Sequence, residues 1–401
     1  MKNKVVFYFF LSLWLIVTYN SQFAEATMPL IGFSIAVFLE AILIAMLVPI
    51  VLRNRLNTYQ KWVIMILVFW LASVRWSVNP EAKDLYRFVF ITYFFVFCIS
   101  QLISTERDVE KVLKLEIFAA LLCGIYVLFF IDSSHLADER LGGEDSERIW
   151  NANDIGLKMA VGYASCLYFL IRKSMNKAIL GILVVIFISI SLMSGSRKVI
   201  VLLVLFTALL MIIRSKGRKK ILYGAYASLI VVVAYLAIMN IAPLYDMIGR
   251  RFELLLAGLH GGDGGSSLTL REEMVGYGIV FWSEKPWLGN GFNAFCEMYG
   301  NITRWYTYSH NNFIELLTNT GVVGVVLYYS LIIYILFKLW KPAFYYKITL
   351  AQVLFLYTFI CFVLDYAMVS YPSVPTIFRL MYTSRYCQIV NLRLALNTDK
   401  T

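Results

Sequence analysis

The sequence contains few charged residues. Asp, Glu, Lys and Arg make up 15% of its 401 residues, and hydrophobic residues make up 60%. A soluble domain has roughly 25% charged residues. The scarcity of charge argues against a soluble globular protein. Many apolar runs are long enough to cross a hydrocarbon core of about 30 Å as helices, so we predict a polytopic membrane protein.

Histidine and cysteine are also scarce. The three histidines are His135, His260 and His310, and they show no metal-binding spacing. The six cysteines are scattered, mostly inside apolar runs and without a CxxC pair, as expected of small apolar core residues. We therefore expect no metal, no cofactor and no disulfide framework. The net charge of +11 does not indicate a nucleic-acid partner, because basic residues in membrane proteins first set the topology.

The apolar runs predict an all-α bundle of about 11–12 spanning helices, forming a single integral-membrane domain over residues 1–401. The first run resembles a signal peptide, but its distance from the cleavage-like site at 24–26 favours an uncleaved span. The predicted spans are 5–19, 28–52, 60–78, 85–104, 111–131, 153–171, 177–194, 197–213, 221–241, 313–340 and 348–369. A short crossing or re-entrant segment at 376–396 would add a twelfth.

Lys and Arg are concentrated in the connections that are cytoplasmic if the N-terminus is cytoplasmic, most strongly in the run at 214–220. This topology places two polar loops, 132–152 and 242–311, on the outer face. The second loop is predicted to contain a surface helix at about 270–284, which ends in a turn at Pro286. We therefore expect a large extracytoplasmic loop with short helices.

Two cationic positions on the predicted outer face could bind an anion. Arg197 and Lys198 follow Ser196 at a helix start, where the helix dipole is already positive. A bound phosphate explains this placement, and so does snorkelling of the two side chains to the interface. Arg271, in the large outer loop, is either a second anion ligand or a solvated surface charge, and its residue type alone favours the surface charge.

His310 precedes an apolar helix that contains Gly321 and Gly324. The glycines leave one helix face without side chains, so another helix can approach closely. Histidine accepts a proton near neutral pH, and at the outer rim of a span His310 could deprotonate a hydroxyl as a general base. A hydrogen-bonded interfacial histidine is the commoner role for a lone histidine.

These residues together carry a resemblance to a known family. His310-Asn311 followed after nine residues by Gly321-Val-Val-Gly324 resembles the H-N-x9-G-x-x-G signature of the O-antigen ligase and polymerase superfamily, which contains WaaL-like ligases and Wzy polymerases. The resemblance covers about residues 148–340. Four further pieces occur in the family's order, namely Asn151-Ala-Asn153, Ser196-Arg197, Arg271 and Pro286-Trp-Leu-Gly289-Asn-Gly291-Phe292.

The resemblance implies a GT-C type membrane glycosyltransferase at the outer face of the bacterial cytoplasmic membrane. Its donor and acceptor would be undecaprenyl-pyrophosphate-linked oligosaccharides within the membrane lipid, and a flippase and a chain-length regulator would be its partners. Transfer would be inverting and independent of metal. The matching residues are Arg197 and Arg271 for pyrophosphate binding, His310 for catalysis, and Asn153, Asn311 and Ser196 for supporting roles.

The family signature alone does not choose the acceptor. A polymerase is favoured, because the stretch from His310 to Leu317 with Tyr328-Tyr329 resembles polymerases of capsule and O-antigen loci. The alternative is an O-antigen ligase that transfers the glycan to lipid A-core. From another class, a lipid-linked oligosaccharide flippase would be expected to carry ionisable residues along a transmembrane route. The few candidates are Glu40, Glu315 and Asp365, a distribution that favours surface chemistry.

Overall fold

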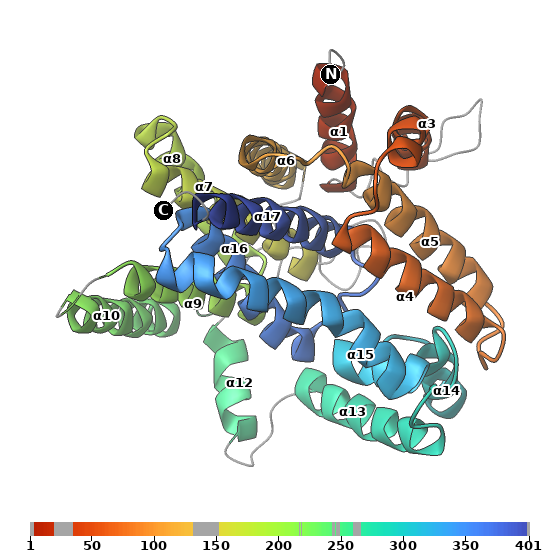
Figure 1. The fold of residues 1–401 in the computed structure, drawn as a ribbon. Helices are drawn as coiled ribbons and strands as arrows, with labels where there is room; N and C mark the ends of the chain where they lie inside the picture. The colour runs from red at the N-terminus through yellow and green to blue at the C-terminus, as the bar shows by residue number, and fades with distance from the viewer. Residues whose placement is uncertain are drawn as a thin grey trace. The chain divides into compact units, whose positions relative to one another are not determined.

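In a computed structural model, all regular secondary structure in the described residues is helical (Figure 1). This confirms the predicted all-α class. The predicted outer loop 132–152, apart from Ala152, lies outside the described residues, as do Asn151, His135 and His260. The described residues are 4–19, 35–130, 152–215, 217, 219–242, 245, 249–259 and 266–398.

Each of the eleven predicted spans corresponds to a helix. Within the described residues, five helical stretches could cross a membrane by length and composition, namely Ile35–Arg53, Glu106–Phe129, Asn153–Arg172, Asn312–Tyr345 and Thr349–Ala367. The helices are α1 (Lys4–Tyr19), α3 (Ile35–Arg53), α4 (Thr58–Val74), α5 (Ala82–Ile99), α6 (Glu106–Phe130), α7 (Ala152–Arg172), α8 (Lys177–Met193), α9 (Arg197–Arg214), α10 (Lys219–Asn240), α15 (Asn312–Trp340) and α16 (Thr349–Leu364).

The chain forms two compact units, each described here by itself. The first unit comprises Met1–Leu43, Arg107–His260 and Leu339–Ile360, and it contains α7 to α9. The second unit comprises Ile44–Glu106, Gly261–Lys338 and Cys361–Thr401, and it contains α4 and α5. The single-domain organisation stays a prediction.

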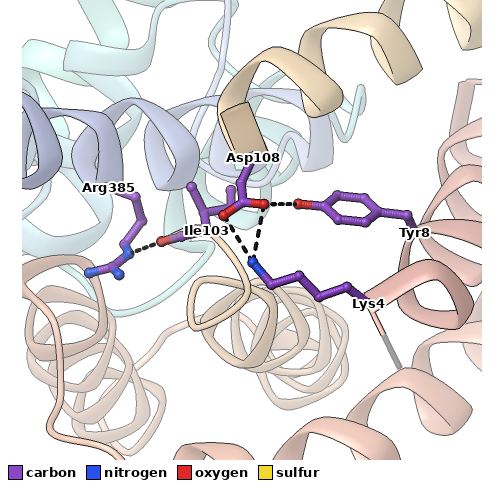
Figure 2. Close-up of polar contacts among 5 residues, drawn as sticks. All are labelled: Lys4, Tyr8, Ile103, Asp108 and Arg385. Atoms are coloured by element: carbon purple, nitrogen blue, oxygen red, sulfur yellow. Dashed lines mark hydrogen bonds and ion pairs between the residues drawn. The ribbon is translucent and has the colours of Figure 1, made fainter. Parts of the chain in front are cut away.

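In the first unit, carboxylates near the start of α6 bind groups from α1 and α7. Lys4 and Tyr8 both point toward Asp108 in Figure 2, with Nζ and Oη each 3.0 Å from a carboxylate oxygen. Two residues further along α6 the contacts are with α7, where Tyr168 Oη donates to Glu110 at 2.5 Å and Arg172 lies 3.8 Å from the same carboxylate. Ion pairs thus hold one end of α1 and of α7 against α6.

In the second unit, the predicted tail segment 376–396 is helical and belongs to α17 (Val374–Thr398). The backbone N–H of Ser370, just before α17, donates to Asn312 Oδ1 at the start of α15. Near the other end of α17, Asn391 donates to the carbonyl of Lys338, close to the end of α15. The helix α17 therefore extends along the second half of α15, as an additional crossing would.

Two arginines of α17 contact the connection between α5 and α6. Arg385 Nε donates to the Ile103 carbonyl at 2.9 Å (Figure 2), and Arg393 pairs with Glu106 at 2.9 Å. The charge pattern predicts this connection on the cytoplasmic side. Arg385 and Arg393, which would lie on the outer side if the chain had only eleven spans, are thus beside a predicted cytoplasmic segment.

The large loop contains the predicted surface helix as α13 (Ser266–Glu284), which begins four residues earlier than expected. It also contains α12 (Arg250–Leu259) and α14 (Ala294–Thr303). One apolar cluster connects α13 and α14 to the first turn of α15, and it consists of Met274, Phe281, Phe295, Tyr299 and Ile314. Burial of these side chains anchors the loop helices beside the residues that follow His310.

The helix α15 is not one continuous span. Gly321 has φ +63° and ψ −169°, which is outside the helical region. Asn312 and Tyr329 are 17 residues apart, yet their side chains form a hydrogen bond of 2.9 Å. In a straight helix this separation would be about 25 Å. The chain therefore folds back at Gly321, and the predicted span 313–340 consists of a short segment followed by a longer helix.

The turn at 286–291 causes this break. In a continuous helix, the N–H groups of residues 322 and 323 would donate to the carbonyls of 318 and 319. The backbone of the turn instead satisfies all four groups. The bonds are Val322 N to Pro286 O (2.9 Å), Val323 N to Trp287 O (3.2 Å), Asn290 N to Thr318 O (2.9 Å) and Gly291 N to Asn319 O (2.8 Å).

This close approach requires glycine. A Cβ atom on Gly321 would lie 2.4 Å from the carbonyl carbon of Trp287, and one on Gly289 would lie 2.5 Å from the Thr320 nitrogen. We expected Gly321 and Gly324 to receive a neighbouring helix. The nearest backbone at Gly321 belongs to a turn, and the nearest atom at Gly324 is Oγ1 of Thr320 in the same element. The expectation was therefore wrong for Gly321. At Gly324 a neighbouring helix does approach, because the Phe69 side chain of α4 would lie 3.2 Å from an added Cβ atom.

Gly321→Ala should strongly destabilise the protein. The left-handed, extended-ψ conformation costs a residue with a side chain about 1–3 kcal/mol, and the added methyl would overlap Trp287. Gly276→Ala on α13 is the matched control, because a Cβ atom there meets nothing within 4 Å. Thermal unfolding in detergent, monitored by size-exclusion chromatography, measures the difference. Equal unfolding temperatures for the two variants would contradict the role assigned to Gly321.

Candidate active site

In the first unit, Asn153, the second asparagine of the N-x-N element, lies beside the Ser196-Arg197 element. Ser196 Oγ donates to Asn153 Oδ1 at 2.7 Å, although 43 residues separate them. Gly156, one turn along α7, makes room for the turn between α8 and α9, since a Cβ atom there would lie 2.8 Å from Ser194 Oγ and from Val199. The fold thus joins Asn153, Ser196 and Arg197 in one place.

Arg197 is the first residue of α9, and its side chain is half-buried. Ser196 is the N-cap residue, but its side chain makes no capping hydrogen bond, and its hydroxyl donates to Asn153. A helix N-terminus with an arginine at its first position combines backbone N–H groups with a guanidinium. This arrangement suits a phosphate group.

A buried lysine lies one turn further along α7, and sequence reasoning missed it. The Lys158 side chain is 3% exposed, and its Nζ lies 2.6 Å from an Asp154 carboxylate oxygen. It also donates to the Tyr19 carbonyl at 3.0 Å. A buried cation requires such partners. The signal that could have found it is a lysine four residues after an aspartate within an otherwise apolar helix.

In the second unit, His310 occupies a tight corner directly before α15. Its φ is +56°, an uncommon value for a residue other than glycine. The neighbouring residues hold this conformation: the Ser309 N–H donates to Glu315 Oε2 at 2.7 Å, and the Ser309 hydroxyl donates to the Asn311 carbonyl at 2.8 Å. The imidazole is half-buried, and its ring centroid lies 4.3 Å from that of Tyr308.

Asn311 has a structural explanation for its place in the motif. Its Oδ1 accepts the backbone N–H groups of Phe313 and Ile314 at 3.0 and 3.2 Å. Asn311 is therefore the N-cap of α15, and an asparagine is among the strongest N-cap residues. In the structure Asn311 therefore fixes where α15 begins, and this is a supporting role of the kind that the resemblance implies.

Asn312 anchors the same corner to the remainder of the unit. Its Nδ2 donates to the Tyr329 hydroxyl at 2.9 Å and to Asp365 at 3.3 Å, and its Oδ1 accepts the N–H groups of Ser370 and Tyr371. The Tyr329 hydroxyl also donates to Asp365 at 3.0 Å. This network is buried, so each polar group depends on its partners.

Glu315 is a second buried carboxylate that supports the corner. It is 1% exposed, and besides the Ser309 N–H it accepts from Asn319 Nδ2 at 3.4 Å. Asn319 Oδ1 in turn accepts the Phe295 N–H at the start of α14. The sequence contained a signal for Glu315 and Asp365, since carboxylates within apolar spans are costly and usually functional. Their partners could not be read from it.

Arg271 lies on α13, and its side chain is half-buried while the adjacent Glu272 and Glu273 are exposed. The structure places it in the second unit with His310, whereas Arg197 belongs to the first unit.

Cys296, on α14, is not a candidate nucleophile. Burial raises the pKa of its thiol, and nearby carboxylates raise it further. In the described part of the chain, no group of three or more His, Cys, Asp or Glu side chains could hold a metal ion.

The fold and these sites define an integral-membrane helical protein whose polar motifs gather at helix starts. Residues 182–329 match the family model Wzy_C, described as O-antigen ligase. This part of the chain is therefore similar to the O-antigen ligase family, in agreement with the resemblance that the motifs carry. The match supports a ligase or polymerase function in O-antigen processing. No curated protein matches the chain.

Asn312→Asp should destabilise the protein at least as much as Asn312→Ala. It retains the acceptor for Ser370 and Tyr371 but replaces a buried donor with an oxygen that faces Asp365. The unsatisfied and repelling groups should cost about 1–3 kcal/mol. The matched control is Asn311→Asp, which keeps the capping oxygen and should be tolerated. Thermal unfolding of the three variants tests this, and a stable Asn312→Asp protein would contradict it.

Proposed function

We propose that the protein is a polysaccharide polymerase of the O-antigen or capsule type. It joins undecaprenyl-pyrophosphate-linked repeat units at the outer face of the bacterial cytoplasmic membrane. The observation that carries this proposal is the docking of the 286–291 turn onto the broken helix α15. The turn that begins at Pro286 and the helix that contains Gly321 are two elements of the family signature, and backbone hydrogen bonds join them there. His310 lies directly before the same helix.

In the proposed reaction, a hydroxyl of the acceptor sugar attacks the anomeric carbon of the donor glycan. The bond from this carbon to the pyrophosphate oxygen breaks, and its electron pair leaves with the pyrophosphate. Arg197 and Arg271 bind the pyrophosphate and neutralise its charge. His310 accepts the hydroxyl proton. One displacement inverts the anomeric configuration and requires no covalent enzyme intermediate.

Several observations support these roles. Arg197 lies at a helix N-terminus that its Ser196 side chain does not cap, which favours an anion at that position. Asn153 positions Ser196 beside it. His310 occupies a constrained backbone conformation, and such conformations cluster at functional sites. The positive-inside pattern supports a cytoplasmic N-terminus and an outward-facing site.

A polymerase is favoured over a ligase by the stretch from His310 to Leu317 together with Tyr328-Tyr329, which resembles polymerases. The two parts of this pattern are in contact in the structure, because Asn312 hydrogen-bonds to Tyr329. An O-antigen ligase acting on lipid A-core is the second candidate, because the matching family is described as O-antigen ligase.

Alanine substitution of His310, Arg197 or Arg271 should each reduce transfer at least about a hundredfold, the range for loss of a general base or of a transition-state donor. The assay uses purified protein in lipid nanodiscs with lipid-linked repeat units and measures polymer on gels. Glu272→Ala is the control, because this side chain is exposed beside Arg271. Wild-type polymer from His310→Ala protein at equal expression would refute the catalytic assignment.

Surface glycan from a deletion strain should distinguish the two acceptors. If the protein is a polymerase, the strain will carry a single repeat unit on its normal acceptor, because ligation proceeds without chain growth. If it is a ligase, polymer will accumulate on the lipid carrier and will be absent from lipid A-core. Mass analysis of both fractions gives the answer, and the second pattern would overturn the polymerase proposal.

A further inference from the structure

The six residues that lead from α14 to His310 carry three exposed aromatic side chains. Trp305 is 47% exposed, Tyr306 is 54% exposed and Tyr308 is 41% exposed, whereas Ser309 is fully buried. A group of exposed aromatic side chains in one short segment can mark a binding site. Their position directly before His310 makes this surface a candidate binding site.

Neighbouring residues hold the rings of Tyr306 and Tyr308. The Tyr306 ring lies on Gly300, where a Cβ atom would be 2.3 Å from its Cδ1. Its hydroxyl donates to Asn301 Oδ1 at 3.2 Å. The Tyr308 ring lies against the His310 imidazole at 4.3 Å between centroids. Rings that are already fixed lose little entropy when they bind a ligand, so they make efficient contact surfaces.

Polar side chains border the same surface. Asn301 Nδ2 donates to Glu297 Oε1 at 3.0 Å, and Asn301 also accepts from Tyr306. Amide and carboxylate groups can form hydrogen bonds with several hydroxyls at once. The surface therefore combines aromatic faces with hydroxyl-binding groups. A pyranose ring has the complementary chemistry, with C–H groups on one face that pack on electron-rich rings and with hydroxyls around its edge.

The geometry points to the acceptor sugar as the occupant, an inference that rests on the proposed function. A hydroxyl that gives its proton to His310 must lie within about 2.6–3.2 Å of the imidazole. The Tyr308 ring is in contact with that imidazole, so a sugar ring bearing this hydroxyl must lie next to Tyr308. We propose that Tyr308 and Tyr306, with Asn301 and Glu297 at the border, form the binding site for the acceptor's terminal sugars.

The test uses a soluble acceptor, so that donor and acceptor can be varied separately. The probe is the repeat-unit oligosaccharide as a methyl glycoside, without lipid or pyrophosphate. At saturating donor, Tyr308→Ala and Tyr306→Ala should each raise the KM for this probe about three- to tenfold, as expected of one aromatic contact. The kcat and the donor KM should stay within twofold. Tyr308→Phe should behave like the wild type, since it keeps the ring.

Tyr345→Ala is the matched control, because Tyr345 is 78% exposed and belongs to a different segment of the chain, the helical turn Lys341–Tyr345. Its acceptor KM should not change. Unchanged acceptor KM in both Tyr308→Ala and Tyr306→Ala, with activity still abolished by His310→Ala, would overturn the sugar site and leave the proposed function intact. A similar rise in donor KM, or poor membrane insertion, would instead identify the tyrosines as interfacial anchors and would also overturn it.

Equilibrium dialysis of the radiolabelled probe gives a second readout that does not require turnover. Wild-type protein should bind the probe, and Tyr308→Ala should bind it several-fold more weakly. Binding that depends on Tyr308 in a protein without transferase activity would refute the proposed function while supporting the sugar site. Equal binding by the wild type and by Tyr308→Ala would refute the sugar site directly.

Discussion

The second unit depends on the backbone hydrogen bonds between the 286–291 turn and α15. A helix broken inside an apolar environment leaves unpaired N–H and C=O groups, each of which costs several kcal/mol. The turn supplies partners for the four groups at Gly321, so the break carries no such penalty. The fold-back then becomes possible, and it brings Asn312 beside Tyr329 and Asp365. The conformation of the His310 corner follows from this arrangement.

Buried polar groups specify this region more than apolar packing does. The apolar cluster around Met274 and Phe295 holds α13 and α14 together, but apolar contacts tolerate small shifts. The hydrogen bonds of Asn312, Glu315 and Asn319 do not, because a buried donor without its acceptor is unfavourable. Together they define where α15 begins and how His310 is presented. In the first unit, the bond between Ser196 and Asn153 performs the same task for Arg197.

Charge has two separate tasks in this chain. Near the starts of α1 and α6, and near the end of α17, lysines and arginines pair with carboxylates or carbonyls, as in Lys4 with Asp108 and Arg393 with Glu106. At the motif positions, Arg197 is the first residue of α9, where the helix N-terminus favours an anion, and Arg271 lies on α13 beside two exposed glutamates. The positive net charge of the chain agrees with the predicted topology, and the proposed pyrophosphate binding would use these two arginines.

The sequence by itself determined the all-α class, the positions of the eleven apolar helices, the helix in the large loop and the resemblance to the O-antigen ligase family. These properties follow from local patterns, because the length and apolarity of a span and the order of short motifs are readable without contacts. Only the tertiary structure decided that Gly321 accommodates a turn, that Asn311 is a cap and that Asn312, Tyr329 and Asp365 meet. Those facts depend on pairings between residues up to 53 positions apart, and no local pattern encodes which distant groups become partners.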